Sequence, residues 1–245
     1  MRIRHHASLG LAATACLVLS GCTNAADWNA NRSSQIHSFD TSSIQAQPDI
    51  IAKLPQGALE DGVLDVAAST DYAPAEFLDP SGTAVGYDVD LTNAIAAVLG
   101  VKGKVHTAEF DSIIASIGSK YDAGISSFTV TPERTAEVDM TAYINVGSRF
   151  NVQAGNPKDV ETSDHLKLCG RTIGVQVGTA QETTMRDAAD KCAQAGKPVL
   201  SVRSYSKQSE ATTGLVGGTI DATYSDSTVA GYAVELTDGQ IVTLG

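Results

Sequence analysis

The sequence alternates between two hydrophobic periods, and this alternation constrains the fold more than any other feature. In the first half of the chain, short apolar runs predict strands at residues 63–68, 104–107 and 123–126, and apolar residues at helical spacing predict helices at 88–99 and 111–117. We expect Asp88 to cap the first of these helices. Its apolar face would consist of Leu91, Ala94, Ile95, Val98 and Leu99, with Gly100 ending it. A strand–helix–strand order favours an α/β sheet with helical crossovers.

A second set of alternating segments follows in the other half of the chain. Strands are predicted at 172–177, 199–203 and 220–224. One helix is predicted to begin at the capping-box pattern 179–182, and another to span 206–215. The stretch 143–157 lies between the two sets and contains two glycines and a proline. We therefore expect an α/β fold of two lobes, each a sheet flanked by helices, with 143–157 as the crossing between them.

Composition narrows the class of protein. The chain has 245 residues, of which 42% are hydrophobic, and this is enough apolar material for one large domain or two small ones. A wholly disordered chain and a multi-span membrane protein are excluded. The formal net charge is −11 and no block of basic residues occurs, which argues against binding to nucleic acid.

The N-terminus has the features of an export signal. Arg2 and Arg4 precede an apolar run from Leu9 to Leu19 that is too short to cross a bilayer. The run ends in Leu-Ser-Gly-Cys22, which resembles a bacterial lipobox. We predict a lipoprotein signal peptide over 1–21 and lipidation of Cys22, which would anchor the protein outside the cytoplasm. The alternative is an ordinary signal peptide with a chance cysteine.

The segment that follows, residues 22–56, is rich in Asn, Ser, Gln and Ala. We expect it to be a lipidated N-terminus followed by a flexible tether.

The cysteines fit this location. Cys16 falls in the signal peptide and Cys22 at the lipidation position, which leaves Cys169 and Cys192 as a pair. In an oxidising compartment we predict a disulfide between them; two reduced, buried thiols are the alternative. No HExxH motif occurs and the histidines lack ligand spacing, so we expect neither a metal nor a cofactor.

One segment predicts an anion site. Thr131 can cap a helix whose first turn contains Arg134, at the positive end of the helix dipole. A cation is unfavourable there unless an anion lies nearby. Arg134, the helix N-terminus and Thr129 could therefore hold a carboxylate together. The alternative is a surface ion pair of Arg134 with Glu133 or Glu137.

Two further positions could contact a charged ligand. Gly178 and Thr179 begin a predicted helix and offer a second anion site, although a plain capping box over 179–182 explains them equally well. Asp226 follows a predicted strand, where open α/β sheets bind ligands, and its carboxylate could pair with an ammonium group. The alternative is an aspartate in a turn.

Aromatic residues could complete such a site, and catalytic motifs are missing. Tyr72, Phe77 and Phe110 could form an aromatic wall, although a single aromatic residue of this kind is more often part of the core. The sequence contains no GxSxG, GxGxxG or P-loop pattern, and Ser126 and Ser127 have no evident histidine partner along the chain.

Five stretches in a fixed order carry a resemblance to a known family. They are residues 70–77, 86–91, 121–134, 174–179 and 218–226. Together they resemble the polar amino-acid family, family 3, of bacterial ABC-transporter solute-binding proteins, over about residues 50–245. The Cys169/Cys192 pair is similar to that of an actinobacterial lipoprotein branch.

The resemblance implies a binding mode. Arg134 would grip the ligand α-carboxylate bidentately, helped by Thr129 and by the backbone N–H of Thr179. Asp226 would bind the α-ammonium with the help of Ser127, and two aromatic rings would sandwich the ligand side chain. The implied ligand-binding residues are Tyr72, Phe110, Ser127, Thr129, Arg134, Gly178, Thr179 and Asp226.

The resemblance also implies domain limits. The fold would be the two-lobed, type II periplasmic binding protein fold, with lobe 1 at 57–146 and lobe 2 at 147–228. Members of the family continue past the position that matches Gly245 and return to lobe 1. We therefore expect residues 229–245 to be an incomplete crossover back to lobe 1, with the C-terminal part of that lobe truncated.

The implied function is capture of a polar amino acid for an ABC importer. The protein would be a monomeric lipoprotein outside the cytoplasm that delivers its ligand to a permease and is not an enzyme. One alternative is an enzyme on the same fold, such as a cyclohexadienyl dehydratase-like lyase with Glu76 as general acid. Another is a truncated remnant that no longer binds a ligand.

Overall fold

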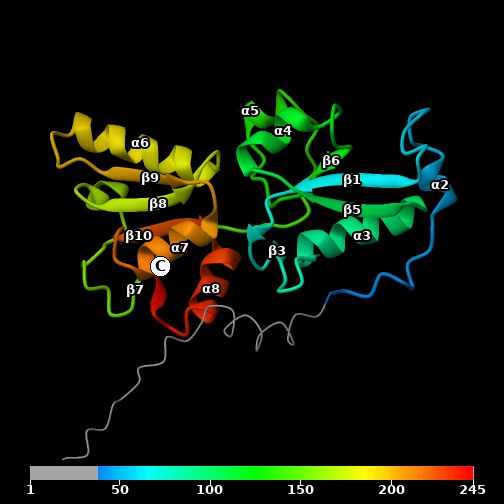
Figure 1. Ribbon diagram of the computed structural model, residues 1–245. Coiled ribbons are helices and arrows are strands. Elements are labelled where there is room, and N and C mark those ends of the chain that lie inside the picture. The colour runs from blue at the N-terminus through cyan, green and yellow to red at the C-terminus, as the bar shows by residue number, and fades with distance from the viewer. Residues whose placement is uncertain (1–37, 245) are drawn as a thin grey trace, which may run out of the picture.

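Two α/β lobes lie side by side (Figure 1). The computed structural model describes residues 38–244, so the predicted signal peptide and Cys22 lie outside the described residues. Lobe 1 precedes lobe 2 in the chain, and residues 137–147, which contain no helix or strand, connect them. We call these residues the connecting segment. Within 38–244 no helix is long and apolar enough to cross a membrane.

Lobe 1 is built on a small parallel sheet. Strand β1 (Val63–Ala68) lies in the centre, between β5 (Lys102–Thr107) and β6 (Ala123–Gly124). The register pairs Val66 with Val105 on one side and with Ala123 on the other. Helix α3 (Tyr87–Leu99) leads into β5, and a 3-10 turn (Phe110–Ser112) with α4 (Ile113–Ser116) leads into β6. The predicted strand–helix–strand order is confirmed.

The prediction for helix α3 was right in its end and wrong in its start. Gly100 ends the helix in the left-handed conformation, as expected. The N-cap, however, is Gly86 and not Asp88. A Cβ at position 86 would collide with the backbone of Ala75, so glycine is needed there. The predicted apolar face is also wrong, since Ile95 is exposed. The buried face consists of Asp88, Val89, Thr92 and Ala96.

A second, antiparallel sheet of lobe 1 was not predicted. It consists of β2 (Asp71–Tyr72), β3 (Glu76–Leu78) and β4 (Ala84–Val85). These strands have two or three residues each, too few for a period-two pattern to be seen. The sheet places Tyr72 and Glu76 in the interior, where both are buried.

The start of the described chain packs along lobe 1. Helix α2 (Pro48–Ile51) lies within the stretch that we expected to be a flexible tether. The N–H of Phe39 donates to Asp90, and the N–H of Gln47 donates to the carbonyl of Val98. From Ser38 onward, the predicted tether is therefore fixed to helix α3.

Lobe 2 has a larger, mixed sheet with the order β11-β7-β10-β8-β9. Its strands are β7 (Ser148–Gln153), β8 (Thr172–Gln176), β9 (Ser201–Tyr205), β10 (Ala222–Asp226) and β11 (Ile241–Leu244). Its helices are α6 (Ala180–Gln194), α7 (Gln208–Val216) and α8 (Ser227–Leu236), with a 3-10 turn at His165–Leu168. Strands β8, β9 and β10 are parallel, and β7 runs antiparallel to both of its neighbours.

Two predictions for this half of the chain were wrong. Strand β7 occupies much of the predicted crossing 143–157, so the lobes are joined earlier. Residues 229–245 do not cross back to lobe 1. Instead, α8 packs against the lobe 2 sheet and β11 pairs with β7, with Val242 opposite Val152. The reason is apolar burial, because Ile241 is completely buried in a lobe 2 core cluster.

The predicted disulfide is confirmed. Cys169 and Cys192 are bonded, with their Cα atoms 5.6 Å apart, and tie the end of the 3-10 turn to helix α6. Cys192 is completely buried and belongs to the largest core cluster of lobe 2, together with Leu168, Ile173 and Met185. The bond therefore fixes the helix to the core of this lobe.

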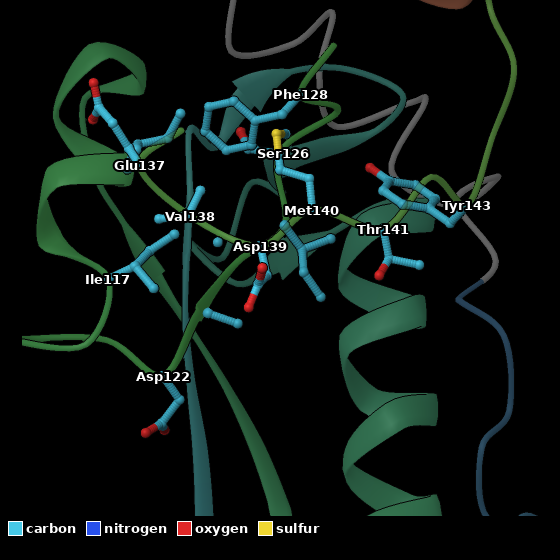
Figure 2. Close-up of a pocket in the computed structure, with 14 residues that line it drawn as sticks. Ile117, Asp122, Ser126, Phe128, Glu137, Val138, Asp139, Met140, Thr141 and Tyr143 are labelled. Carbon is cyan, nitrogen blue, oxygen red and sulfur yellow. The ribbon is translucent and has the colours of Figure 1, made fainter. Parts of the chain in front are cut away.

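A groove runs beside β6 in lobe 1 (Figure 2). Its volume is about 470 Å³, and it lies between β6, helix α4 and the connecting segment. Its apolar lining includes Ile114, Ile117, Phe128, Val138 and Met140. This side of the lobe 1 sheet is therefore not fully covered.

Candidate functional site

The predicted ligand-binding residues meet where the two lobes face each other. One small cavity is lined by residues of both lobes: Tyr72, Phe110, Ser127, Thr129 and Arg134 of lobe 1 with Thr179, Ala180, Gln181 and Asp226 of lobe 2. Seven of the predicted residues therefore lie together. Gly178, the remaining one, reaches the site through its carbonyl oxygen, which accepts a hydrogen bond from Arg134.

Arg134 is placed by a short capped helix. Helix α5 (Pro132–Thr135) begins after Thr131, whose hydroxyl accepts a hydrogen bond from the Arg134 N–H, as predicted. The guanidinium group donates to the carbonyl of Thr129 at 2.7 Å and, across the lobes, to that of Gly178 at 3.0 Å. The alternative of an ion pair with Glu133 or Glu137 is wrong, because the guanidinium group turns toward lobe 2 instead.

The start of helix α6 forms the opposite wall. The Thr179 hydroxyl accepts a hydrogen bond from the N–H of Glu182, which confirms the predicted capping interaction. The Glu182 carboxylate accepts a hydrogen bond from the N–H of Gly178 at 2.7 Å. The Gly178 N–H is therefore already satisfied, so of the two residues that begin the helix Thr179 remains the candidate for contact with an anion.

Asp226 ends strand β10 and is buried. Its carboxylate accepts a hydrogen bond from Gln181 at 2.7 Å, and its own N–H donates to the Tyr72 hydroxyl at 3.2 Å. Burial raises the pKa of Asp226, while Gln181, Tyr72 and Arg134 counteract this rise. Sequence reasoning missed Gln181, although it lies inside the capping-box motif that begins helix α6.

Two of the three aromatic candidates line the cavity, and the third does not. Tyr72 and Phe110 line the cavity. Phe110 stacks on Phe128, with ring centroids 4.5 Å apart, and the Arg134 guanidinium lies near both rings. Phe77 is not part of this wall. Its ring lies 6.3 Å from that of Tyr232, on helix α8.

Comparison with known proteins then decides the family. The model of the bacterial extracellular solute-binding proteins, family 3, matches residues 64–236. The chain belongs to this family.

Known relatives agree with this assignment. The chain is 31% identical to the arginine-binding protein ArgT of Corynebacterium glutamicum over 242 residues, covering 98% of this chain and 76% of that protein. An ancestral arginine-binding protein bound to arginine superposes with a TM-score of 0.69 at 33% identity, covering 75% of this chain and 79% of the other.

A third similar protein connects the fold to an enzyme. It is the ancestral amino acid-binding protein AncCDT-1, a precursor of cyclohexadienyl dehydratase, with a TM-score of 0.67 at 30% identity, covering 76% of this chain and 78% of the other. The fold of this family 3 protein is the two-lobed, type II periplasmic binding protein fold expected from the sequence.

Glu76 does not face the cavity of this family 3 protein. It is completely buried, and its carboxyl group accepts a hydrogen bond from the Ser126 hydroxyl at 2.5 Å. Burial and the nearby Asp88 carboxylate raise the pKa of Glu76 well above its usual value. Glu76 therefore lies behind the wall of the site, in surroundings that favour its protonated form.

The lobes are close together around the site. The cavity holds about 10 Å³, which is at most the volume needed for one water molecule. Besides the Arg134 contact, Gln176 of lobe 2 donates to the Ser69 hydroxyl of lobe 1 at 3.1 Å. An amino acid can enter only when the lobes separate, which is the hinge motion open to a protein of this architecture.

The cavity carries charged groups of both signs. Within residues 38–244, no group of three or more His, Cys, Asp or Glu side chains is placed to hold a metal ion. The charged groups that line the cavity are Arg134 on lobe 1 and Asp226 on lobe 2. The two opposite charges thus lie on opposite sides of the cavity.

Proposed function

We propose that this protein captures an α-amino acid between its lobes, with the ligand carboxylate on Arg134 and the ligand ammonium on Asp226. One observation supports the proposal above the others: a guanidinium group on one lobe and a carboxylate on the other line the same cavity. A zwitterion needs one partner of each sign, and buried charges are tolerated only when they are paired.

The contacts of Arg134 suggest how the carboxylate would bind. Two of its N–H groups donate to backbone carbonyls, one on each lobe. The bond to Thr129 lies within lobe 1 and would aim the guanidinium group as the lobes open, whereas the bond to Gly178 crosses the lobes and would be given up. A carboxylate would replace this carbonyl with a stronger, charge-assisted acceptor.

The other wall residues have supporting roles in the proposal. Tyr72 and Phe110 would hold the ligand side chain between them, and Ser127 would assist at the ammonium group. Gln181 donates to both Asp226 and the Ser148 hydroxyl, so its amide would keep the carboxylate oriented. This arrangement pre-organises the anion before the ligand arrives, which limits the entropy lost on binding.

We propose L-arginine as the first ligand to test. Relatives at 31% and 33% identity are arginine-binding proteins. The electrostatics agree, because Arg134 is the cation at the cavity while the carboxyl groups of Asp226 and Asp88 lie at or behind its wall. A cationic ligand side chain would therefore meet negative potential.

We propose further that the protein works outside the cytoplasm as a monomeric lipoprotein anchored through Cys22 and passes its ligand to an ABC permease. The family of extracellular solute-binding proteins supports the location. The lipobox-like sequence before Cys22 supports the anchor. Metabolic labelling with a fatty acid, compared between the natural chain and Cys22→Ala, tests the anchor directly.

We infer that the protein is a binder and not a lyase. The carboxyl group that a dehydratase would need, Glu76, is buried behind the cavity and bonded to Ser126. Formation of an aromatic product from a prephenate-like acid by the purified chain would contradict this inference.

Calorimetric titration with each of the twenty amino acids tests the proposal. We expect a polar amino acid, L-arginine first, to bind to the natural chain. Arg134→Ala should lose about 2–5 kcal/mol of binding free energy, because the carboxylate loses its charge-assisted partner. Arg203→Ala, an exposed arginine on β9, is the matched control and should bind normally. Equal affinity in the two variants would contradict the assignment of Arg134.

A further inference from the structure

Asp88 is a buried carboxylate next to the site, and the proposed binding mode gives it no direct contact with the ligand. It lies in the first turn of helix α3 and is 1% exposed. It accepts three hydrogen bonds: from the Ser127 N–H at 2.8 Å, from the Ser127 hydroxyl at 3.1 Å and from the Tyr143 hydroxyl at 2.7 Å. A carboxylate with this many donors is firmly held.

Ser127 needs such support because of its backbone conformation. Its φ is +49°, in the left-handed region that residues other than glycine adopt only at a cost. Such conformations persist where the surroundings hold them. Here Asp88 holds both the N–H and the hydroxyl of Ser127, a residue that lines the cavity.

Tyr143 brings the connecting segment to the same carboxylate. Its hydroxyl donates to Asp88 and also accepts from the Ser127 N–H at 3.1 Å. Figure 2 shows the Tyr143 ring beside the end of a helix, and the hydrogen bond to Asp88 identifies this helix as α3. One carboxylate thus joins helix α3, the wall of the site and the link between the lobes.

A second buried carboxyl group, that of Glu76, borders this network. Glu76 is fully buried, and burial together with the nearby Asp88 raises its pKa well above the usual value. Burial and Asp88 also raise the pKa of Tyr143, which keeps its hydroxyl a donor. The Tyr87 hydroxyl completes the set at 3.3 Å from the Ser127 hydroxyl.

We infer that Asp88 is the positioning residue of the amino-acid site. It holds Ser127 in the left-handed conformation that the site requires and ties it to Tyr143, so that ligand capture and lobe movement act on one carboxylate. This inference rests on the proposed function, because it concerns the affinity of that same site.

A double-mutant cycle tests this inference, with L-arginine, or the amino acid that the natural chain binds best, as the probe. Asp88→Asn should weaken binding about tenfold or more, as expected for loss of a charged hydrogen-bond acceptor. Ser127→Gly adopts the left-handed conformation without help. In the Ser127→Gly background, Asp88→Asn should weaken binding less than about threefold, because no strained serine remains for Asp88 to hold.

Two other variants complete the experiment. Asp90→Asn changes the next acidic residue of the same helix turn, which bonds to Phe39 outside the site, and should leave affinity unchanged. Tyr143→Phe removes one hydroxyl from a half-exposed ring, so the chain should fold even if Asp88→Asn does not. We expect it to weaken binding about threefold to tenfold.

The outcomes separate this inference from the proposed function. The free energy of unfolding of the same variants is also measured by urea denaturation without ligand. Coupling between the two positions in this free energy shows that Asp88 holds Ser127. The inference is overturned if the two positions are coupled in the free energy of unfolding but Asp88→Asn weakens binding equally in both backgrounds. Asp88 would then have a structural role only. Unchanged affinity in Tyr143→Phe would overturn the tie to the connecting segment. If the natural chain binds none of the twenty amino acids, the proposed function itself fails.

Discussion

The two lobes are stabilised in different ways. Lobe 2 has a five-stranded sheet, a disulfide and a continuous core around Ile173, Met185 and Cys192. Lobe 1 has a three-stranded parallel sheet, smaller core clusters and a groove beside β6. Lobe 1 also has a buried polar network around Asp88, which reaches the connecting segment. We conclude that lobe 2 is a rigid platform, whereas lobe 1 depends on specific hydrogen bonds to shape its half of the site.

The difference extends to the two ligand anchors. Asp226 sits at the end of an interior strand and is oriented by Gln181 of the same lobe. Arg134 sits on a four-residue helix after a loop that contains the left-handed Ser127. We therefore expect changes in lobe 2 to act mainly on global stability, and changes in lobe 1 to act on the geometry of the site.

The two lobes should differ most in the free energy of unfolding lost at two matched core residues. Ile173→Ala in lobe 2 should cost about 4 kcal/mol, because its crowded core cannot collapse into the space left behind. Ile113→Ala in lobe 1 should cost about 2–3 kcal/mol, because side chains bordering the groove can move in. Both side chains are completely buried in the natural chain. Urea unfolding measures the two losses, and equal values would mean that lobe 1 is packed as tightly as lobe 2.

The disulfide should matter to lobe 2 alone. Replacing Cys169 and Cys192 by alanine opens a link between residues 23 positions apart, which should cost about 3 kcal/mol. Amide hydrogen exchange should become faster in β8 and α6 and stay the same in β1 and β5. Faster exchange throughout both lobes would show that they unfold as one unit.

Two crowded glycines sharpen the comparison further. A Cβ at Gly174 would collide with the Ile220 side chain in lobe 2, and a Cβ at Gly124 would lie 2.7 Å from the Ile113 side chain in lobe 1. Gly174→Ala should cost about 2–3 kcal/mol and Gly124→Ala about 1 kcal/mol, because only the second site borders a groove that can take up displaced atoms. Thermal melting of both variants checks the order, and the reverse order would contradict it.

The smallest expected effect concerns pH and lobe 1. The folded-state pKa of Glu76 is raised by burial and by Asp88. The stability that Glu76 contributes is therefore fully present below its pKa in the unfolded chain. This contribution is lost as pH rises toward the folded-state pKa, since only the unfolded chain releases the proton. Glu76→Gln should flatten this decline in the free energy of unfolding measured across pH. Glu109→Gln, at an exposed position, should leave the decline as it is.

Much of the fold could be predicted from the sequence where local patterns decide structure. Strand β1 and the capped start of α6 were right because periodicity and capping are local. Strand β11 and the buried face of α3 could not be predicted, because pairing with β7 and burial of Asp88 depend on distant parts of the chain.

The same division holds for the site. Arg134, Thr179 and Asp226 could be found because a helix start and a strand end mark them. The Asp88 network could not, because its members Ser127 and Tyr143 are 39 and 55 residues away from Asp88 in the sequence.

The central claim is that Arg134 recognises the carboxylate of an amino acid held between the lobes. Calorimetric titration of the natural chain and of Arg134→Ala, each with L-arginine and with agmatine, which lacks the carboxylate, tests it most directly. We predict that the natural chain prefers L-arginine strongly and that Arg134→Ala binds the two compounds equally weakly. A natural chain that binds both equally well, or a variant that keeps the full preference, would contradict the claim.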